Sequence, residues 1–261
     1  MKRTMHARAL ILVVPLLVAA CGGGSTGPSA GSASPTSPST SSTAAATPSA
    51  SATADEYMPS TQVATALIPA KSMPGSKRTH TWREDYPDLS APTGYVETWL
   101  TFVSGNASCR ALLQGHPYTP GSSAGQTLSS SHLLAFEMVS SLQTEADAKA
   151  LMAENVAQLK GCTKFKARVD GRTYTFRHAG MVAKQSIGGE QTVTHRITAN
   201  VGSGQIILWM MESRLGGEVM FLDLNPIDPK GAEQYSLVAT LALGKFTDTV
   251  GTYRTAHPRT T

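Results

Sequence analysis

A stretch of 33 residues without a charge or an aromatic ring most restricts what this chain can fold into. Residues 22–54 consist only of Ser, Thr, Ala, Gly and Pro. This composition buries too little apolar surface to offset the conformational entropy lost on folding, so we predict a disordered linker here. Its r.m.s. reach is roughly 30 Å. Folding is therefore restricted to the chain after residue 54, which is long enough for one domain with its own core.

The segment before the linker is first basic, then apolar, and ends at a cysteine. Residues 1–8 carry three basic side chains and no acidic one, and residues 9–19 form an apolar run. That run is too short to cross a hydrocarbon core of about 30 Å as a helix, and the layout is typical of a secretory signal peptide. The sequence Val-Ala-Ala-Cys at 18–21 resembles a bacterial lipobox, which predicts cleavage before Cys21 and acylation of its thiol. The alternative is an ordinary signal peptide followed by a chance cysteine.

These features predict four parts: a signal peptide at 1–20, a lipid-anchored linker at 21–54, a globular domain at 55–250 and a flexible tail at 251–261. Each buried CH₂ of an acyl chain adds about 0.8 kcal/mol, so two or three chains would hold the protein on a membrane. We therefore expect a lipid-anchored protein on the outer face of the cytoplasmic membrane.

The net charge argues against nucleic acid as a partner. Of the 22 Lys and Arg residues, three belong to the predicted signal peptide, which leaves 19 against 18 Asp and Glu. A nearly neutral mature chain lacks the basic excess that nucleic-acid binding requires.

Patterns in the globular part predict helices and strands in alternation. Helical spacing appears at 59–68, 144–161 and 228–243, with Gly244 as the expected end of the last helix. Strand patterns appear at 95–103, 132–140, 165–169, 173–176, 192–201, 205–211 and 218–224, several of them separated by glycine turns. Residues 71–93 and 121–131 are predicted as loops. The order predicts an α+β fold, with an antiparallel sheet of about five to six strands and helices packed on one side.

Two cysteines fall within the predicted domain, Cys109 and Cys162. Two cysteines in an exported domain are expected to form a disulfide. Such a bridge closes a loop of about 54 residues and would contribute about 4 kcal/mol in the chain-entropy description. The alternative is a pair of buried free thiols.

Residues 141–165 combine the end of a strand, a helix rich in small residues, and a cysteine just past the helix end. This segment resembles the PknH-like extracellular sensor domains of actinobacteria, and the resemblance extends over residues 57–251. It implies the same Cys109–Cys162 pairing, a following sheet and C-terminal helix, and a large cleft for an unidentified ligand.

The search for catalytic chemistry gives one motif. Residues 121–125 read Gly-Ser-Ser-Ala-Gly, which matches the nucleophile elbow of α/β-hydrolases. The elbow requires a strand before it and a helix after it, and neither is predicted here. We predict no catalytic residue, no cofactor and no metal site, since the histidines also lack metal-ligand spacing.

An apolar cluster in the late strands is the best candidate for a binding surface. Trp209, Met211 and Met220 belong to the late predicted strands, and alternation places Trp209 and Met211 on one face. They either fill the core or line an adaptable apolar cleft, because methionine deforms to fit varied ligands. If the domain binds a ligand through this cluster, these three residues are the ones we predict to contact it.

The expected function is that of a non-catalytic lipoprotein of the cell surface with a sensor-like domain. Its expected partners are the membrane, a small molecule or lipid, and an envelope protein or peptidoglycan. Two other functions fit the sequence: an accessory envelope protein without a small ligand, and a hydrolase whose site has no recognisable motif.

Overall fold

The computed structural model describes residues 57–85, 100–114, 120–169, 171–181, 191–202 and 204–258. The predicted signal peptide, Cys21 and the predicted linker lie outside the described residues. No helix in the described part of the chain is both long enough and apolar enough to cross a membrane.

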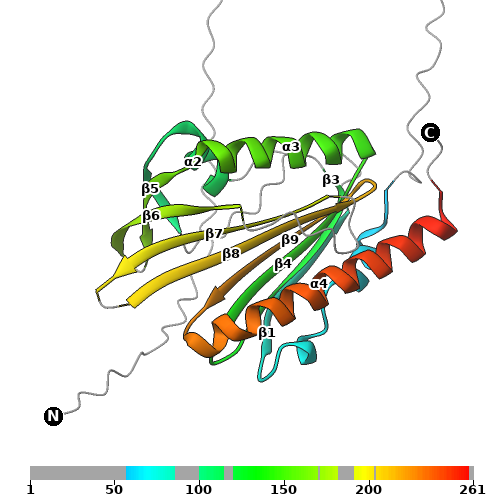
Figure 1. Ribbon diagram of the computed structural model, residues 1–261. Coiled ribbons are helices and arrows are strands. Elements are labelled where there is room, and N and C mark those ends of the chain that lie inside the picture. Colours follow the sequence, from blue (N-terminus) through cyan, green and yellow to red (C-terminus); the bar gives the residue numbers. More distant parts are fainter. Residues whose placement is uncertain are drawn as a thin grey trace, which may run out of the picture. The chain divides into compact units, whose positions relative to one another are not determined.

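The domain is built on one antiparallel sheet of nine strands, more than the five to six expected (Figure 1). The strand order across the sheet is β1-β3-β4-β9-β8-β7-β6-β5-β2. The strands in chain order are β1 (Lys77–Asp85), β2 (Thr101–Ser104), β3 (Pro120–Ser129), β4 (Leu133–Leu142), β5 (Lys164–Val169), β6 (Arg172–Met181), β7 (Gln191–Val201), β8 (Gly204–Leu215) and β9 (Glu218–Pro226). From β7 to β9 consecutive strands are neighbours, because two-residue glycine turns join them.

The predicted loops at 71–93 and 121–131 contain two strands, β1 and β3. β1 is an edge strand in which only Trp82 is even half-buried, so it shows no apolar alternation. β3 is rich in Gly and Ser because large rings lie against it: a Cβ at Gly125 would collide with the Trp82 indole. Its small residues therefore mark close packing and not a loop.

In the described part of the chain after β1 there are three α-helices, namely α2 (Ala107–Gln114), α3 (Glu145–Gly161) and α4 (Pro229–Ala256). The Thr144 hydroxyl caps α3 by accepting the Asp147 N–H at 3.0 Å, and the Asp228 carboxylate caps α4 by accepting the Gly231 N–H at 3.0 Å. α4 does not end at Gly244 as predicted. It continues to Ala256, so the first six residues of the expected tail are helical.

The N-terminal part of the domain forms three short turns of helix. These are α1 (Ser60–Val63), η1 (Ala64–Ala66) and η2 (Ala70–Ser72). They pack beside α4 on the same face of the sheet, through Met58, Val63, Ala66, Ile68 and Met73.

Helices cover both faces of the sheet, not one side as predicted. α3 and α4 both pack on β4, β8 and β9. They do so from opposite sides, as two successive residues of β8 show. Met211 belongs to the core under α4, whereas Glu212 lies under α3 and accepts a hydrogen bond from Asn155. Successive side chains of a strand point to opposite faces of the sheet. Figure 1 shows α3 along one side of these strands and α4 along the other.

The core is divided accordingly. The α4 face holds one large apolar cluster that includes Leu133, Val139, Leu222, Leu243 and Phe246. The α3 face holds two smaller clusters, one under α3 and one around the Cys109–Cys162 disulfide. The disulfide confirms the sequence prediction and joins α2 to the end of α3.

Both edge strands of the sheet are irregular. β1 carries charged residues at five of its nine positions, and its pairing with β3 shifts register between Arg78 and His80. β2 has only four residues and shifts register against β5 between Phe102 and Ser104.

Candidate functional site

The segment Tyr57–Ser72 enters the domain across the ends of β3 and β4. A Cβ at Gly121 would collide with the Tyr57 ring, so the ring lies directly on β3. The Met58 N–H donates to the Ser141 hydroxyl at 2.9 Å, and the Ser122 hydroxyl donates to the Met58 carbonyl. These buried bonds fix the point at which the preceding chain joins the domain.

A buried carboxyl group holds the other end of this segment. Glu137 of β4 accepts the Ile68 N–H at 3.0 Å, and the Gln126 amide donates at 2.7 Å both to Glu137 and to the Ile68 carbonyl. Burial raises the pKa of Glu137 to about 7, although the hydrogen bonds from Gln126 and Ile68 and the charge of Arg78 act to lower it. The α1–η1 segment is therefore fastened by a group that titrates near neutral pH.

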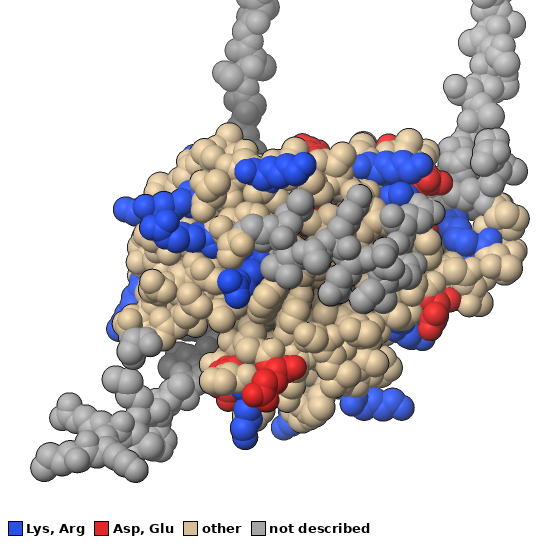
Figure 2. Space-filling view, in the orientation of Figure 1, with Lys and Arg blue, Asp and Glu red and all other residues tan. Residues whose placement is uncertain are grey.

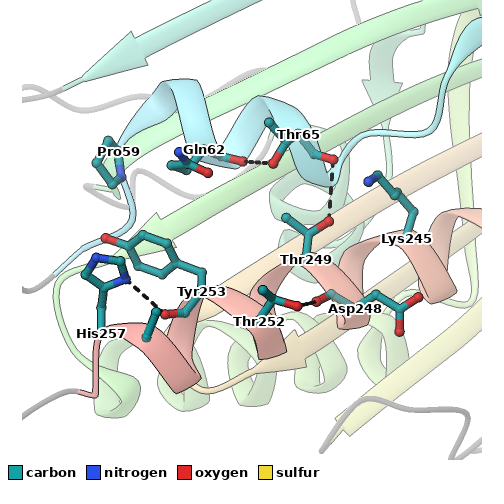
Figure 3. Close-up of a pocket in the computed structure, with 10 residues that line it drawn as sticks. Pro59, Gln62, Thr65, Lys245, Asp248, Thr249, Thr252, Tyr253 and His257 are labelled. Atoms are coloured by element: carbon teal, nitrogen blue, oxygen red, sulfur yellow. Dashed lines mark hydrogen bonds between the residues drawn. The ribbon is translucent and has the colours of Figure 1, made fainter.

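A groove runs between the α1–η1 segment and the C-terminal half of α4 (Figure 3). Its volume is about 600 Å³. The Thr249 hydroxyl donates to the Thr65 carbonyl across it at 3.4 Å, and the Tyr253 and His257 rings stack at one end with centroids 4.4 Å apart. We call this the α1–α4 groove; its lining is Pro59, Gln62, Thr65, Lys245, Asp248, Thr249, Thr252, Tyr253, Ala256 and His257.

The groove is chemically mixed. Hydroxyl, amide, ammonium and carboxylate groups line its walls, and one aromatic ring pair closes an end. Most of the exposed lining is nevertheless apolar, so the site suits a ligand with a largely apolar body, a flat part that can stack on Tyr253, and a few donors and acceptors for the polar groups. No described group in the groove is activated as a nucleophile by a neighbouring base.

A second cavity, the β1 pocket, lies on the other side of the α1–η1 segment. Its volume is about 510 Å³. Arg78, Arg83 and Thr81 come from β1, and the buried Gln126 side chain from β3 also lines it, with an Oε1 atom that has no hydrogen-bond partner among the described residues. The α1–η1 segment is thus the shared wall of two cavities.

A group of buried titratable residues lies on the α3 face, away from both cavities. His178 and His195 pack edge to face with centroids 5.5 Å apart, and neither nitrogen of His195 has a hydrogen-bond partner in the described structure. Burial, with a smaller contribution from the nearby His178, lowers the pKa of His195 to about 3. Burial also raises the pKa of Glu212 to about 7, against the effect of its hydrogen bond from Asn155 at 3.0 Å. At neutral pH the His195 imidazole is therefore uncharged.

The three residues predicted to contact a ligand lie together on the α4 face, with Trp209 and Met211 on one face as the alternation indicated. Met211 and Met220 are buried in the core beneath α4. Trp209 stacks on Tyr235 of α4 with centroids 4.4 Å apart, and the Arg196 guanidinium lies over the Trp209 ring, 5.3 Å from its centroid. All three fill the core, and none lines either cavity.

The Gly-x-Ser-x-Gly motif lies wholly inside β3 and not at a strand-to-helix turn. Ser123, at the position of the nucleophile, is buried, and Ser122 donates to the Met58 carbonyl. This geometry does not form a nucleophile elbow. Among the described residues no group of three or more His, Cys, Asp or Glu side chains is placed to hold a metal ion.

Sequence reasoning missed the residues that line the two cavities. The α1–α4 groove depends on α4 continuing to Ala256, but the sequence predicted that this helix ends at Gly244. The β1 pocket depends on a strand at Lys77–Asp85, but the sequence predicted a loop there. The only sequence signal was the helical spacing of Thr249 and Thr252, four and seven positions after Lys245.

No family model matches the sequence, and no curated protein matches it significantly. Several chains of solved structures are similar, among them the following two. The extracellular domain of PknH from Mycobacterium tuberculosis matches with a TM-score of 0.51 at 12% identity, covering 76% of this chain and 99% of that one. A putative uncharacterised protein from Mycobacterium smegmatis matches with a TM-score of 0.38 at 13% identity, covering 74% of this chain and 99% of its own. The chain therefore has the fold of the PknH extracellular domain, as the resemblance in residues 141–165 predicted.

Proposed function

We propose that this chain is a lipid-anchored, extracytoplasmic, non-catalytic binding protein, and that its sensor-like domain takes a small ligand in the α1–α4 groove. The observation that carries the proposal is the groove itself, about 600 Å³ between α4 and the segment that leads into the predicted tether. That volume lies in the range of about 300–1,000 Å³ usual for small-molecule sites. The shared fold with an extracellular domain and the predicted lipobox support the location.

The position of the groove explains how occupancy could be sensed. α1 and η1 have only seven residues together, and the Thr249 hydroxyl donates to the Thr65 carbonyl across the groove. A ligand that contacts both walls would add contacts between α4 and this segment. Since Tyr57 and Met58 continue directly from the segment toward the linker, a shift of the segment on binding would change how the tether leaves the domain.

The test is native mass spectrometry of the full-length protein extracted from its host in mild detergent. We expect a co-purifying mass in the wild type. The substitution Thr252→Trp fills the groove and should abolish that mass. The matched control Thr240→Trp, at an exposed position of α4 outside the groove, should retain it.

A bare protein in both the wild type and the control, also after incubation with host extract, would contradict ligand binding. That outcome would favour an accessory envelope protein without a small ligand. Retention of the ligand by Thr252→Trp would place the binding site elsewhere.

A further inference from the structure

The four strands at one end of the sheet carry positive charge only. β2, β5, β6 and β7 together contain six Lys and Arg and no Asp or Glu. In Figure 2, Lys and Arg side chains gather at the upper left, where Figure 1 places β5 and β6, and no Asp or Glu side chain appears beside them. The other five strands carry four Lys and Arg and six Asp and Glu, so the charge of the sheet is polarised between its two ends.

Three of these cations form a row on β5. Lys164, Lys166 and Arg168 are exposed and alternate with Phe165 and Ala167, which are buried in the cluster around the disulfide. The three cations therefore point to the opposite face of the sheet, the α4 face. Along a strand, alternate residues are spaced by about 7 Å.

Two more cations extend the row across the sheet. Arg177 of β6 is exposed, alternates with the buried Phe176, and stands directly opposite Lys164. Arg196 of β7 follows the buried His195 in the strand, so its side chain lies on the opposite face, as Arg177 does. The Arg196 guanidinium lies over the Trp209 ring. These five side chains, Lys164, Lys166, Arg168, Arg177 and Arg196, are called the basic face below.

The basic face is left open by the helices. α4 packs on β4, β8 and β9 and does not extend its cover over β5 or β6. The residues interleaved with the cations are polar, namely Thr173, Thr175 and Thr198. No described ion pair includes any of the five cations.

Repulsion among these cations lowers the stability of the folded sheet, so their placement is not explained by folding. Like charges placed directly opposite on neighbouring strands, as Lys164 and Arg177 are, destabilise a sheet. An anion between them removes the repulsion. A phosphate group suits the pair, because its several oxygens can accept from an ammonium and a guanidinium together.

We propose that the basic face binds a linear, soluble polymer of the cell envelope that carries repeated phosphate groups. The regular spacing along β5 fits a chain with repeating charges better than it fits one small anion. The phosphates would lie along β5. Lys164 and Arg177 would share one phosphate group, and Arg196 on β7 would contact another.

The basic face lies away from the point at which the preceding chain joins the domain. That chain joins at β4, through the bond from Met58 to Ser141. β5 is five strand positions further along the sheet. At about 4.8 Å per strand this separates the two points by roughly 24 Å. The attachment of the chain therefore does not occupy the basic face.

The test measures binding of fluorescently labelled linear polyphosphate to the full-length protein in mild detergent, by anisotropy over a salt series. Five cations predict that log K falls with log salt with a slope of about −3.5, from roughly 0.7 per cation on a single-stranded polyanion. The triple variant K164Q/K166Q/R168Q should lower the affinity at least about tenfold and reduce the slope by about 2. The control K71Q/K77Q/K160Q removes the same charge from exposed positions elsewhere and should bind nearly as the wild type does.

Three outcomes would overturn the proposal. Equal losses of affinity in the triple variant and the control would show that polyphosphate is attracted by the net charge of the protein and not by a specific site. Equal binding of polyglutamate of matched length would remove the assignment to phosphate. Binding to vesicles that contain anionic lipid, without binding to polyphosphate, would assign the face to a membrane. Thr252→Trp should leave polyphosphate binding unchanged, which separates this site from the α1–α4 groove.

Discussion

Individual buried groups give the folded state opposing responses to pH. The pKa of His195 is lowered to about 3, so its imidazole stays neutral while that of the unfolded chain gains a proton below about pH 6.5. Stability from this residue is therefore lost as the pH falls from 6.5 toward 3. Glu137 and Glu212 have pKa values raised to about 7, so stability from each is lost as the pH rises from 4.5 through 7. With two carboxyls against one strongly shifted imidazole, these groups favour the folded state most near pH 4.5.

The substitution Glu212→Gln isolates one of these effects. Glutamine keeps an oxygen that can accept the Asn155 amide hydrogen bond, but it never ionises. We expect equal free energies of unfolding near pH 4.5 and a variant more stable than the wild type by about 3 kcal/mol at pH 8. Urea unfolding at pH 4.5, 6 and 8 measures the difference. The exposed Glu233→Gln should show no such trend, and a pH-independent gap for Glu212→Gln would refute the raised pKa.

At the scale of elements, the sequence predicted those whose signals are local. The capped helix α3 and the hairpins turning at Gly171, Gly202 and Gly216 were predicted, because cap and turn residues act within a few positions. Each of the three glycines has a positive φ, which other residues rarely adopt.

The elements that were missed depend on distant residues. β3 is a strand because its small residues receive the rings of Tyr57 and Trp82, more than 40 positions away in the chain. α4 passes Gly244 because Phe246 and Val250 beyond it are buried in the core, and this burial outweighs a cost of about 1 kcal/mol for an interior glycine. The α1–α4 groove follows from the second of these facts, so it could not be predicted either.

The disulfide is an element-level constraint, since it ties α2 to the end of α3. Replacing both cysteines by alanine (Cys109→Ala with Cys162→Ala) should lower the free energy of unfolding by about 4 kcal/mol, because the unfolded chain regains the freedom of a loop of about 54 residues. Urea denaturation measures this loss. The reduced wild type should unfold at nearly the same urea concentration as the variant. An unchanged midpoint in the variant would mean that the bridge does not restrict the unfolded chain.

At the scale of the whole molecule, one buried network joins both ends of the domain. Glu218 of β9 is fully buried and accepts hydrogen bonds from Ser141 at 2.8 Å and from the Arg254 guanidinium, Nε at 2.9 Å. Ser141 in turn accepts the Met58 N–H. The last turns of α4, the sheet and the entering chain are therefore connected through one carboxylate.

Removing the cation leaves that carboxylate buried without a compensating charge. We expect Arg254→Ala to lower the free energy of unfolding by about 3 kcal/mol. The neighbouring exposed Thr255→Ala should change it by less than about 0.5 kcal/mol. Thermal unfolding of the two variants compares them directly, and equal midpoints would show that residues 251–256 contribute nothing to the fold.

The irregular edge strands have a consequence for many copies of this chain on one surface. An open sheet edge can recruit a strand from a neighbour and begin an aggregate. Here one edge, β1, is dense in charge and kinked by a register shift, and the other, β2, is four residues long and also kinked. Neither offers a flat template, so the chain can be displayed at high density without polymerising through its own sheet.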